Sequence, residues 1–321
     1  MPEKKERILW LDVLKGLLMM CVLVEHSLPA DLYVKCYTPF FLTTFFFVSG
    51  ITFSAGESFR AFALKRAKRL LIPLFSLSLI RFAMGYVLGD HEVLLHLIGV
   101  VLQINEWYDE LWFIACMFTA SLLFYGVARL DARRPAAGAV CAGLLCLAGM
   151  LDMTLLHLRF PWQLELACIM VPFMYLGYQY RRRGSWQRVF CSVPVIAASA
   201  ALYVLLVFGL DATVKIRMEV FYHPVTFLLA ALAAIIPLTA LAGLLSRTPL
   251  HRPLSFVGQN TLFYFAFGGM IRIIFYAVTD RIGLSGPLLL SPICALSTAL
   301  ILAIPAILAK RVAPWLTEGI R

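Results

Sequence analysis

The stretch "RILWLDVLKGLLMMCVLVEHS", residues 7–27, decides the fold class because it is an apolar run about as long as a bilayer is thick. Similar runs recur along the chain, and 61% of the 321 residues are hydrophobic while only 14% are charged. The sequence therefore predicts an all-α, polytopic membrane bundle of about ten helices and excludes a soluble fold. The expected spans are residues 8–27, 37–55, 70–88, 111–128, 136–153, 165–180, 189–208, 224–245, 255–278 and 287–309.

Basic residues gather in alternate loops, which sets the orientation of the bundle. With the N-terminus in the cytoplasm, twenty Lys and Arg residues fall in inner segments and five in outer ones, as the positive-inside rule requires. We therefore expect both termini in the cytoplasm. The net charge of +10 reports this topology, and nucleic acid is not an expected partner.

The remaining overall features are consistent with one membrane domain over residues 1–321. The eight cysteines show no Cys-x-x-Cys spacing, so neither a disulfide framework nor a metal site is predicted. Asp12 and Lys15 interrupt the first apolar run and no small-x-small cleavage site follows, so we expect a membrane helix there rather than a signal peptide.

A short apolar segment, residues 91–104, cannot span a bilayer and is expected to be an outer interfacial or re-entrant helix. The sequence that follows it, "NEWYDELWFI" (residues 105–114), combines carboxylates with aromatic rings. Such a mixture is typical of a sugar-binding cleft and also of an aromatic belt at the membrane surface, and the belt is favoured for Trp107 and Tyr108. The residues concerned are Glu106, Trp107, Tyr108, Asp109, Glu110 and Trp112.

The first span carries three ionisable residues, Asp12, Lys15 and His26, on one stripe of the helix. Each costs about 2.5 to 3.5 kcal/mol to insert, so each needs a partner, water or a function. Asp12 and Lys15 either form an ion pair near the inner interface or line an internal path. For His26 a general-base role is favoured, because an imidazole changes charge near neutral pH. Glu25 points away from the stripe.

Two further sets of cations need explanation. Arg81 lies near the middle of the third span, where its partner is expected to be Glu165, Asp152 or a substrate anion. The second inner loop, "FRAFALKRAKRLLIP" (residues 59–73), carries five cations. Such a loop can mark topology, contact anionic lipid or hold the phosphates of a nucleotide.

These residues, in this order, resemble the acyltransferase-3 family of membrane acyltransferases, and most closely its fucose 4-O-acetylase-like branch. Five elements carry the resemblance: "RILWLDVLKG" with "VEHS", "FFFVSGITF", "KRAKRLLIP", "LWFI" and "VGQNTLFYF". The strong part covers residues 7–118. The chain departs from the family pattern at Glu25, where a small residue is common, and at Phe41 and Thr43, where His and Pro are usual. It also has no His after Tyr264, where many members have one.

The resemblance implies a bacterial cytoplasmic-membrane enzyme that moves an acyl group, usually acetyl, from acyl-CoA to a hydroxyl of a cell-surface glycan or lipid-linked sugar. Acyl-CoA would be a co-substrate, no bound cofactor is expected, and membrane lipids are the other expected contacts. The expected catalytic residues are His26 and Asp12, and the expected acyl-CoA-binding residues are Lys15, Lys65, Arg66 and Arg69. The expected acceptor-binding residues are Arg81, Glu106, Asp109, Glu110 and Trp112.

Two other classes of protein remain as alternatives. A transporter or glycan flippase would use the charges of the first span and Arg81 to line a substrate path, although no internal repeat or pair of broken helices is detectable. A purely structural membrane protein would leave the buried charges without a use.

Overall fold

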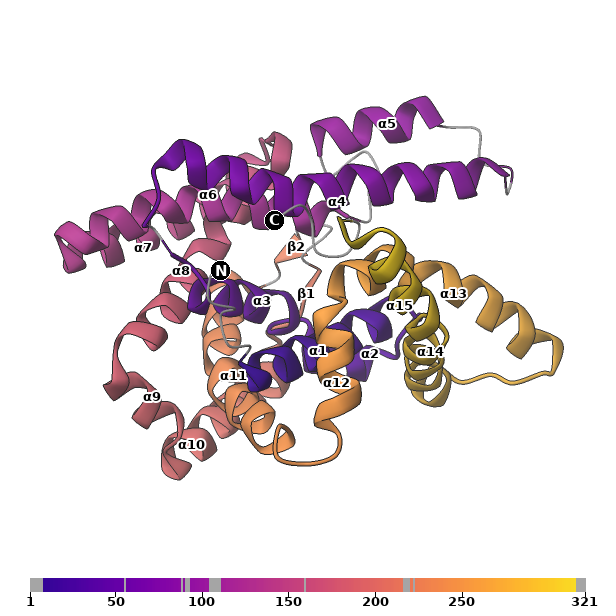
Figure 1. Cartoon of the computed structure of the whole chain (residues 1–321). Helices are drawn as coiled ribbons and strands as arrows, with labels where there is room; N and C mark the ends of the chain where they lie inside the picture. The colour runs from indigo at the N-terminus through magenta and orange to yellow at the C-terminus, as the bar shows by residue number, and fades with distance from the viewer. Residues whose placement is uncertain are drawn as a thin grey trace.

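The computed structural model describes residues 8–54, 56–87, 89, 93–103, 111–158, 160–215, 220–221 and 223–315. Helices make up nearly all of this part of the chain, as Figure 1 shows. A two-residue antiparallel pair, β1 (Val214–Lys215) with β2 (Val220–Phe221), forms a short ribbon beside the helices. The predicted helical fold class is therefore confirmed for the described residues.

The N-terminal half alternates long helices with short connecting ones. Its α-helices are α1 (Leu9–Glu25), α2 (Asp31–Tyr37), α3 (Phe41–Ile51), α4 (Phe59–Val87), α5 (Val93–Leu102), α6 (Trp112–Arg133) and α7 (Pro135–Leu151). A π-helical turn, η1 (Asp152–Leu156), extends α7, and a 3₁₀ turn, η2 (Pro161–Gln163), precedes the next long helix. The ten-residue α5 is too short to span a bilayer, as expected for this segment.

The C-terminal half is built in the same way, with several spans broken into two helices. Its elements are α8 (Leu164–Arg182), α9 (Gly184–Phe190), α10 (Val193–Val204), the π-helical turn η3 (Leu205–Gly209), α11 (Pro224–Leu245), α12 (His251–Gln259), α13 (Thr261–Arg281), α14 (Pro287–Ile301) and α15 (Ala303–Val312). The expected span 255–278 is thus interrupted at Asn260, which lies between α12 and α13.

Seven helical segments of the described chain are long and apolar enough to cross a membrane, and the bent pair formed by α9 and residues 193–209 would make an eighth. The seven are Asp31–Ile51, Phe59–Val87, Trp112–Arg133, Pro135–Leu156, Pro224–Leu245, Thr261–Arg281 and Pro287–Val312. The 17-residue α1 is not among them, nor is α8, which carries Glu165 and two arginines. The structure thus supports a multi-pass membrane protein with seven or eight such segments, and the expected count of ten is not established.

Residues 59–73, which were expected to form a loop, are helical, because α4 begins at Phe59 and runs through Pro73 to Val87. Ala, Leu, Lys and Arg dominate residues 60–71, and all four are good helix formers. The consequence for the candidate site is direct: Arg66 and Arg69 lie one helical turn apart on the same side of α4.

Two helices form the centre of the packing. α1 contacts α3, α11, α12, α13 and α14, and α8 contacts α3, α6 and α7, so that α3 joins the two groups. In Figure 1, α4, α6, α7 and α8 lie above α1 and the helices around it. Because α3 contacts both α1 and α8, the helices around α1 and those around α8, including α6, pack together.

Glycines allow the closest helix contacts. A Cβ atom on Gly16 of α1 would lie 2.0 Å from the Leu254 carbonyl oxygen of α12, and one on Gly258 would lie 1.9 Å from the Asp12 carbonyl oxygen. Between α3 and α8, a Cβ on Gly50 would lie 2.0 Å from the carbonyl oxygen of Met174. Small residues of this kind let membrane helices approach backbone to backbone.

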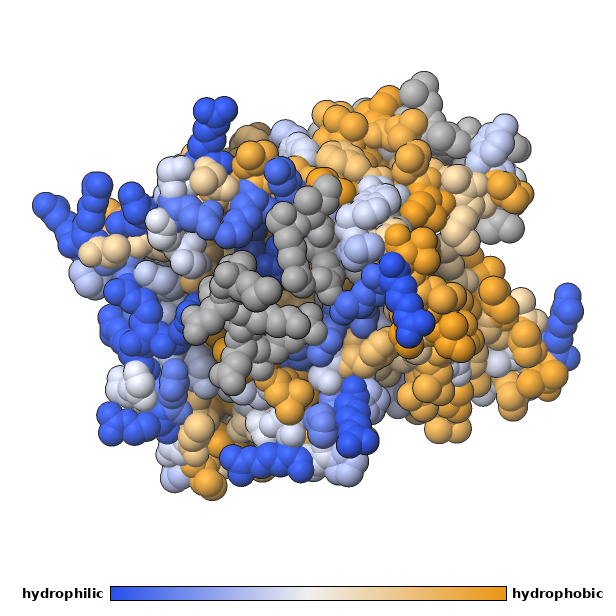
Figure 2. Space-filling model, viewed as in Figure 1, coloured by the Kyte–Doolittle hydropathy of each residue, from blue (hydrophilic) through white to orange (hydrophobic). Residues whose placement is uncertain are grey.

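The surface divides by hydropathy in the way a membrane protein requires. Figure 2 shows hydrophobic residues over α5, α13 and α14, and hydrophilic residues over the side where α7 and α9 lie. Many of the exposed large side chains are aliphatic, including Ile273, Ile274 and Leu289. In water this surface would be costly, so contact with lipid is its natural environment.

Candidate active site

His26 ends the first helix. It follows Glu25, the last residue of α1, and its backbone N–H donates a hydrogen bond to the Val22 carbonyl at 3.0 Å. The half-buried imidazole packs edge-on against Phe265 of α13, with ring centroids 6.2 Å apart. Phe265 directly follows the buried Tyr264 on α13. In this chain an aromatic face therefore supports the imidazole.

Hydrogen bonds from two other helices fix the backbone beside His26. The Ser27 hydroxyl lies within hydrogen-bonding distance of two carbonyl oxygens, those of Val24 at 2.7 Å and Ser291 of α14 at 3.0 Å. The hydroxyl of Tyr276, on α13, donates to the Ser27 carbonyl. The turn that carries His26 is thus attached to α13 and α14, which limits the positions that the imidazole can take.

Glu25 has a partner of its own. The Tyr37 hydroxyl, at the end of α2, donates a hydrogen bond to the Glu25 carboxylate. Tyr37 is itself buried and packs edge-on against Phe41. The described contact of Glu25 is therefore with α2.

Asp12 and Lys15 form the ion pair that was one of the two interpretations of these residues. The Lys15 Nζ lies 2.5 Å from Asp12 Oδ1, with the carboxylate buried and the lysine partly exposed. The pair lies 14 and 11 residues before His26, so Asp12 is about 21 Å from it along α1. Asp12 is thus a residue of the opposite end of α1, beside the tight contact with Gly258.

Arg66 occupies a different kind of polar site. From α4 its Nη2 donates to the Ser49 hydroxyl of α3 at 2.8 Å, and its Nε donates to the Ser121 hydroxyl of α6 at 3.1 Å. Both partners are neutral, so the positive charge of the guanidinium is oriented without being cancelled. Among the described residues, no carboxylate forms an ion pair with Arg66.

The neighbouring cations of α4 are less constrained. Arg69 is exposed one turn further along, and Lys65 is exposed and paired with Glu57, Nζ to Oε1, at 2.6 Å. Lys15 and Arg66 share no described partner, so the expected acyl-CoA-binding residues fall into two groups. Lys65, Arg66 and Arg69 form one group on α4, and Lys15 on α1 is the other.

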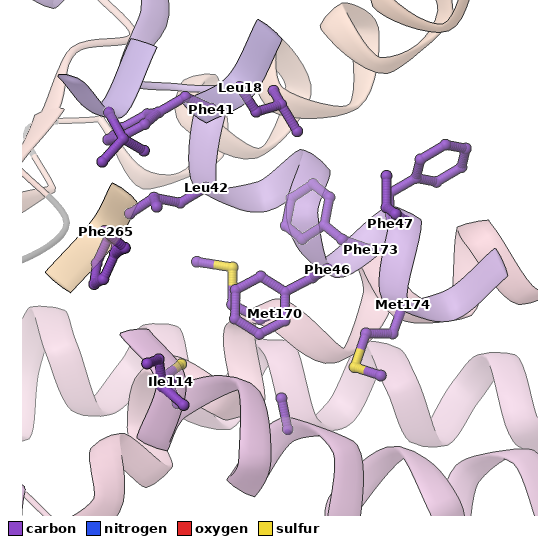
Figure 3. Close-up of a cluster of buried hydrophobic side chains, with 14 of the residues drawn as sticks. Leu18, Phe41, Leu42, Phe46, Phe47, Ile114, Met170, Phe173, Met174 and Phe265 are labelled. Carbon is purple, nitrogen blue, oxygen red and sulfur yellow. The ribbon is translucent and has the colours of Figure 1, made fainter. Parts of the chain in front are cut away.

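Aromatic contacts lead from His26 towards Arg66. Phe265 lies 5.7 Å from Phe113 of α6, and Phe113 lies 5.6 Å from Phe45 and 5.4 Å from Phe46 of α3, all between ring centroids. Phe45 is one turn before Ser49, the residue that holds Arg66. Figure 3 shows Phe265 and Phe46 within a cluster of buried side chains that continues to Met174 of α8.

A protein-family model for an acyltransferase domain matches residues 8–309, which is nearly the whole chain and includes every helix named above except the last residues of α15. The chain belongs to the acyltransferase-3 family. Neither a curated protein nor a solved structure matches it. Membership supports a membrane acyltransferase, and the fucose 4-O-acetylase-like branch remains a sequence prediction.

The expected acceptor side of this acyltransferase-3 protein is only partly described. Trp112 is buried at the first residue of α6, next to Phe113. Arg81 is half-buried on α4. The acidic patch of Glu106, Asp109 and Glu110 lies outside the described residues, so the choice between a sugar cleft and an aromatic belt stays open.

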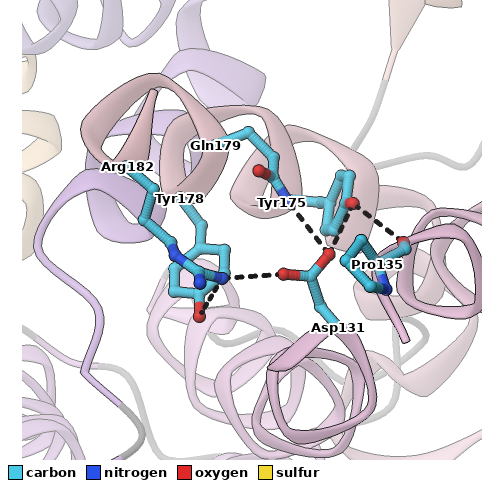
Figure 4. Close-up of polar contacts among 6 residues, drawn as sticks. All are labelled: Asp131, Pro135, Tyr175, Tyr178, Gln179 and Arg182. Atoms are coloured by element: carbon cyan, nitrogen blue, oxygen red, sulfur yellow. Dashed lines mark hydrogen bonds and ion pairs between the residues drawn. The ribbon is translucent and has the colours of Figure 1, made fainter. Parts of the chain in front are cut away.

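A second buried charged side chain of this acyltransferase-3 protein forms hydrogen bonds with a neighbouring helix. Asp131, near the end of α6, accepts hydrogen bonds from Tyr175 Oη at 2.7 Å, Gln179 Nε2 at 2.9 Å and Arg182 Nη1 at 2.9 Å (Figure 4). Arg182 also lies over the ring of Tyr178, 5.0 Å from its centroid. This cluster joins α6 to α8, and the Arg182 guanidinium neutralises the Asp131 carboxylate.

Sequence reasoning missed the residues that support the site from other helices. Ser121, Ser27, Tyr276 and Arg272 are not singled out by the sequence analysis. A hydroxyl in an apolar helix is too common to be a signal by itself. Arg272 did carry a signal, because a guanidinium within a span needs an explanation.

Proposed function

We propose that this acyltransferase-3 protein is a membrane O-acyltransferase that moves an acyl group, most simply acetyl, from cytoplasmic acyl-CoA to a sugar hydroxyl. The acceptor is a cell-surface glycan or its lipid-linked precursor. Residues 1–321 act as one integral domain of a bacterial cytoplasmic membrane, with both termini in the cytoplasm. Family membership supports the reaction class.

The observation that carries the proposal is the placement of two groups at the ends of one aromatic run. His26 contacts Phe265, and Arg66 is held by Ser49, one turn from Phe45. Along α6, Phe113 and Ser121 are eight residues apart, which is about 12 Å. A phosphate-bearing donor held at Arg66 could therefore extend its thioester arm towards His26 between α3 and α6.

Arg66 and Arg69 would bind the phosphates of acyl-CoA. Two guanidinium groups one turn apart suit a nucleotide with several phosphates, since each can donate two parallel hydrogen bonds. Ser49 and Ser121 would keep Arg66 extended before the donor arrives. Lys65 would contribute less to phosphate binding, because it already forms an ion pair with Glu57.

His26 would act as the general base. A ring nitrogen takes the proton of the acceptor hydroxyl while the hydroxyl oxygen forms a bond to the thioester carbonyl carbon. The tetrahedral intermediate then breaks its carbon–sulfur bond, and the CoA thiolate leaves with the electron pair. The imidazolium returns its proton to that thiolate, so His26 is neutral again and no further reactant is needed.

The test uses purified protein in lipid nanodiscs with acetyl-CoA, and measures free CoA thiol with and without candidate glycans and lipid-linked sugars. The wild type should release thiol in an acceptor-dependent way. His26→Ala should lose activity by at least about 100-fold, the usual contribution of a general base, while its melting temperature is retained.

His223→Ala is the matched control, since His223 is exposed at the start of α11. It should behave as the wild type does. Acceptor-dependent release that survives in His26→Ala would refute the general-base role. No release from the wild type with any acceptor, together with uptake of a labelled sugar into vesicles, would favour a transporter instead.

A further inference from the structure

Arg272 lies on the face of α13 that meets the His26 turn. Phe265, Arg272 and Tyr276 are separated by seven and four residues, which places them on one stripe of the helix. Phe265 packs on the His26 ring, and the Tyr276 hydroxyl bonds the Ser27 carbonyl. A cation therefore lies on α13 between the two residues that hold the candidate general base.

The surroundings place the guanidinium close to α14 as well. Arg272 lies one turn before Tyr276 on α13, and α13 packs against α14. Ser291, one turn before Cys294, provides the carbonyl oxygen near the Ser27 hydroxyl. Arg272 thus belongs to the same small region as the turn that carries His26.

The charge of Arg272 has no counter-ion in the part of the chain that the structure describes. The side chain is half-buried and makes no ion pair or hydrogen bond there. Glu25 is bonded to Tyr37, and Asp280 is two turns further along α13 and exposed. An arginine within a membrane span costs several kcal/mol without a partner, so an anion from outside the chain is the natural one.

The same helix also exposes large apolar side chains beside Arg272. Ile273 and Ile274 are 65% and 64% exposed, and Val278 is exposed one turn later. Figure 2 shows that hydrophobic residues predominate over α13 and α14. A ligand that reaches Arg272 along this face needs an apolar chain as well as an anionic group.

We propose that Arg272 binds the phosphate of a lipid-linked sugar acceptor, whose hydrocarbon chain lies along the exposed face of α13 and whose sugar is thereby presented to His26. This inference rests on the proposed function and narrows its acceptor to a lipid phosphate. The phosphate offers the planar guanidinium paired oxygen acceptors, and the lipid chain covers the neighbouring isoleucines.

Direct binding tests the site without relying on catalysis. The probes are farnesyl phosphate, farnesol and inorganic phosphate, added to purified full-length protein in detergent, with affinity measured by thermophoresis. Farnesyl phosphate should bind the wild type about 10 to 100 times more tightly than Arg272→Gln, the usual value of a charged hydrogen bond. Arg272→Lys should fall between the two.

The matched control is Arg281→Gln, which removes an exposed cation from the last turn of the same helix and should bind as the wild type does. Equal affinity of the wild type for farnesyl phosphate and farnesol would overturn the inference, even if Arg272→Gln failed to fold. Inorganic phosphate that binds as tightly as farnesyl phosphate would also overturn it, and so would phosphatidylglycerol that displaces the probe completely at equal concentration.

Acyl transfer measured on the same preparations separates the two proposals. If the wild type transfers acetyl to an acceptor while Arg272→Gln binds farnesyl phosphate normally, the acceptor site is wrong and the proposed function is retained. If Arg272-dependent binding is seen but no acceptor is acetylated, the proposed function is wrong and the lipid-phosphate site is retained.

Discussion

Asp131 and Arg66 both carry a charge at a contact between helices. Among the described residues, a basic partner neutralises the charge of Asp131, whereas only neutral groups accept hydrogen bonds from Arg66. Asp131 is buried and receives three hydrogen bonds, one of them from the oppositely charged Arg182. Arg66 is held by two hydroxyl groups, which fix its direction and leave its charge intact. A charge that is neutralised within the chain stabilises the fold, whereas a charge that is oriented but not neutralised is available to a ligand.

Both sites include a residue of α6, so their variants can be compared within one helix. Ser121 and Asp131 are ten residues apart on α6, or about 15 Å. Variants at the two sites should therefore separate stability from donor binding within the same element.

The largest effect is expected for Asp131→Ala. The change removes a buried acceptor and leaves the Tyr175 hydroxyl, the Gln179 amide and the Arg182 guanidinium without it, so the free energy of unfolding should fall by about 2 to 4 kcal/mol. The measurement is the melting temperature in detergent. The KM for acetyl-CoA of the folded fraction should not change.

Tyr175→Phe is the graded control for this prediction. It removes one of the three donors and keeps the ion pair with Arg182, so its loss should be about 1 kcal/mol. A large increase in donor KM for Asp131→Ala, at an unchanged melting temperature, would contradict the assignment of Asp131 to the fold.

Arg66→Gln should show the reverse pattern. Its melting temperature should be nearly unchanged, because the native charge has no counter-ion among the described residues. The KM for acetyl-CoA should rise about 10 to 100 times, as expected for loss of a charged hydrogen bond to phosphate. Initial rates over a range of acetyl-CoA concentrations measure this change.

Lys68→Gln provides the matched control, since Lys68 is an exposed cation on the same turn of α4. It should raise the donor KM by less than about a factor of two, because exposed charges are screened by solvent and salt. If Lys68→Gln and Arg66→Gln had equal effects, the whole basic segment would act as a diffuse attraction, and Arg66 would not be a distinct phosphate site.

The sequence predicts one part of this comparison and misses the other for a physical reason. Asp12, Lys15 and His26 lie on a single helix, so the helical period alone places them on one stripe, and the Asp12–Lys15 ion pair follows from a separation of three residues. The two hydrogen bonds that fix Arg66 depend on how α3, α4 and α6 pack together. Periodicity within one helix carries no information about a neighbour 55 residues away, which is the separation of Ser121 from Arg66.

The same limit applies to the end of α1. The family pattern predicts a functional histidine at position 26, but its support comes from Phe265 and Tyr276 of α13 and from α14. The loop expected at residues 59–73 failed for a different reason. The clustered cations were assigned to a loop between two apolar spans, although Lys and Arg also favour helices.

The smallest expected effect tests whether the hydroxyls at Arg66 orient it for the donor. Ser49→Ala removes the acceptor 2.8 Å from Nη2 but keeps the guanidinium and its bond to Ser121. The donor KM should rise about three- to tenfold, the value of one hydrogen bond to a charged partner that is partly replaced by the remaining one. Ser49→Thr retains a hydroxyl and should restore most of the affinity. In the Arg66→Gln background Ser49→Ala should have almost no further effect on donor KM, because the group that it positions is absent; equal effects in both backgrounds would show that Ser49 acts on the packing of α3 and not through Arg66.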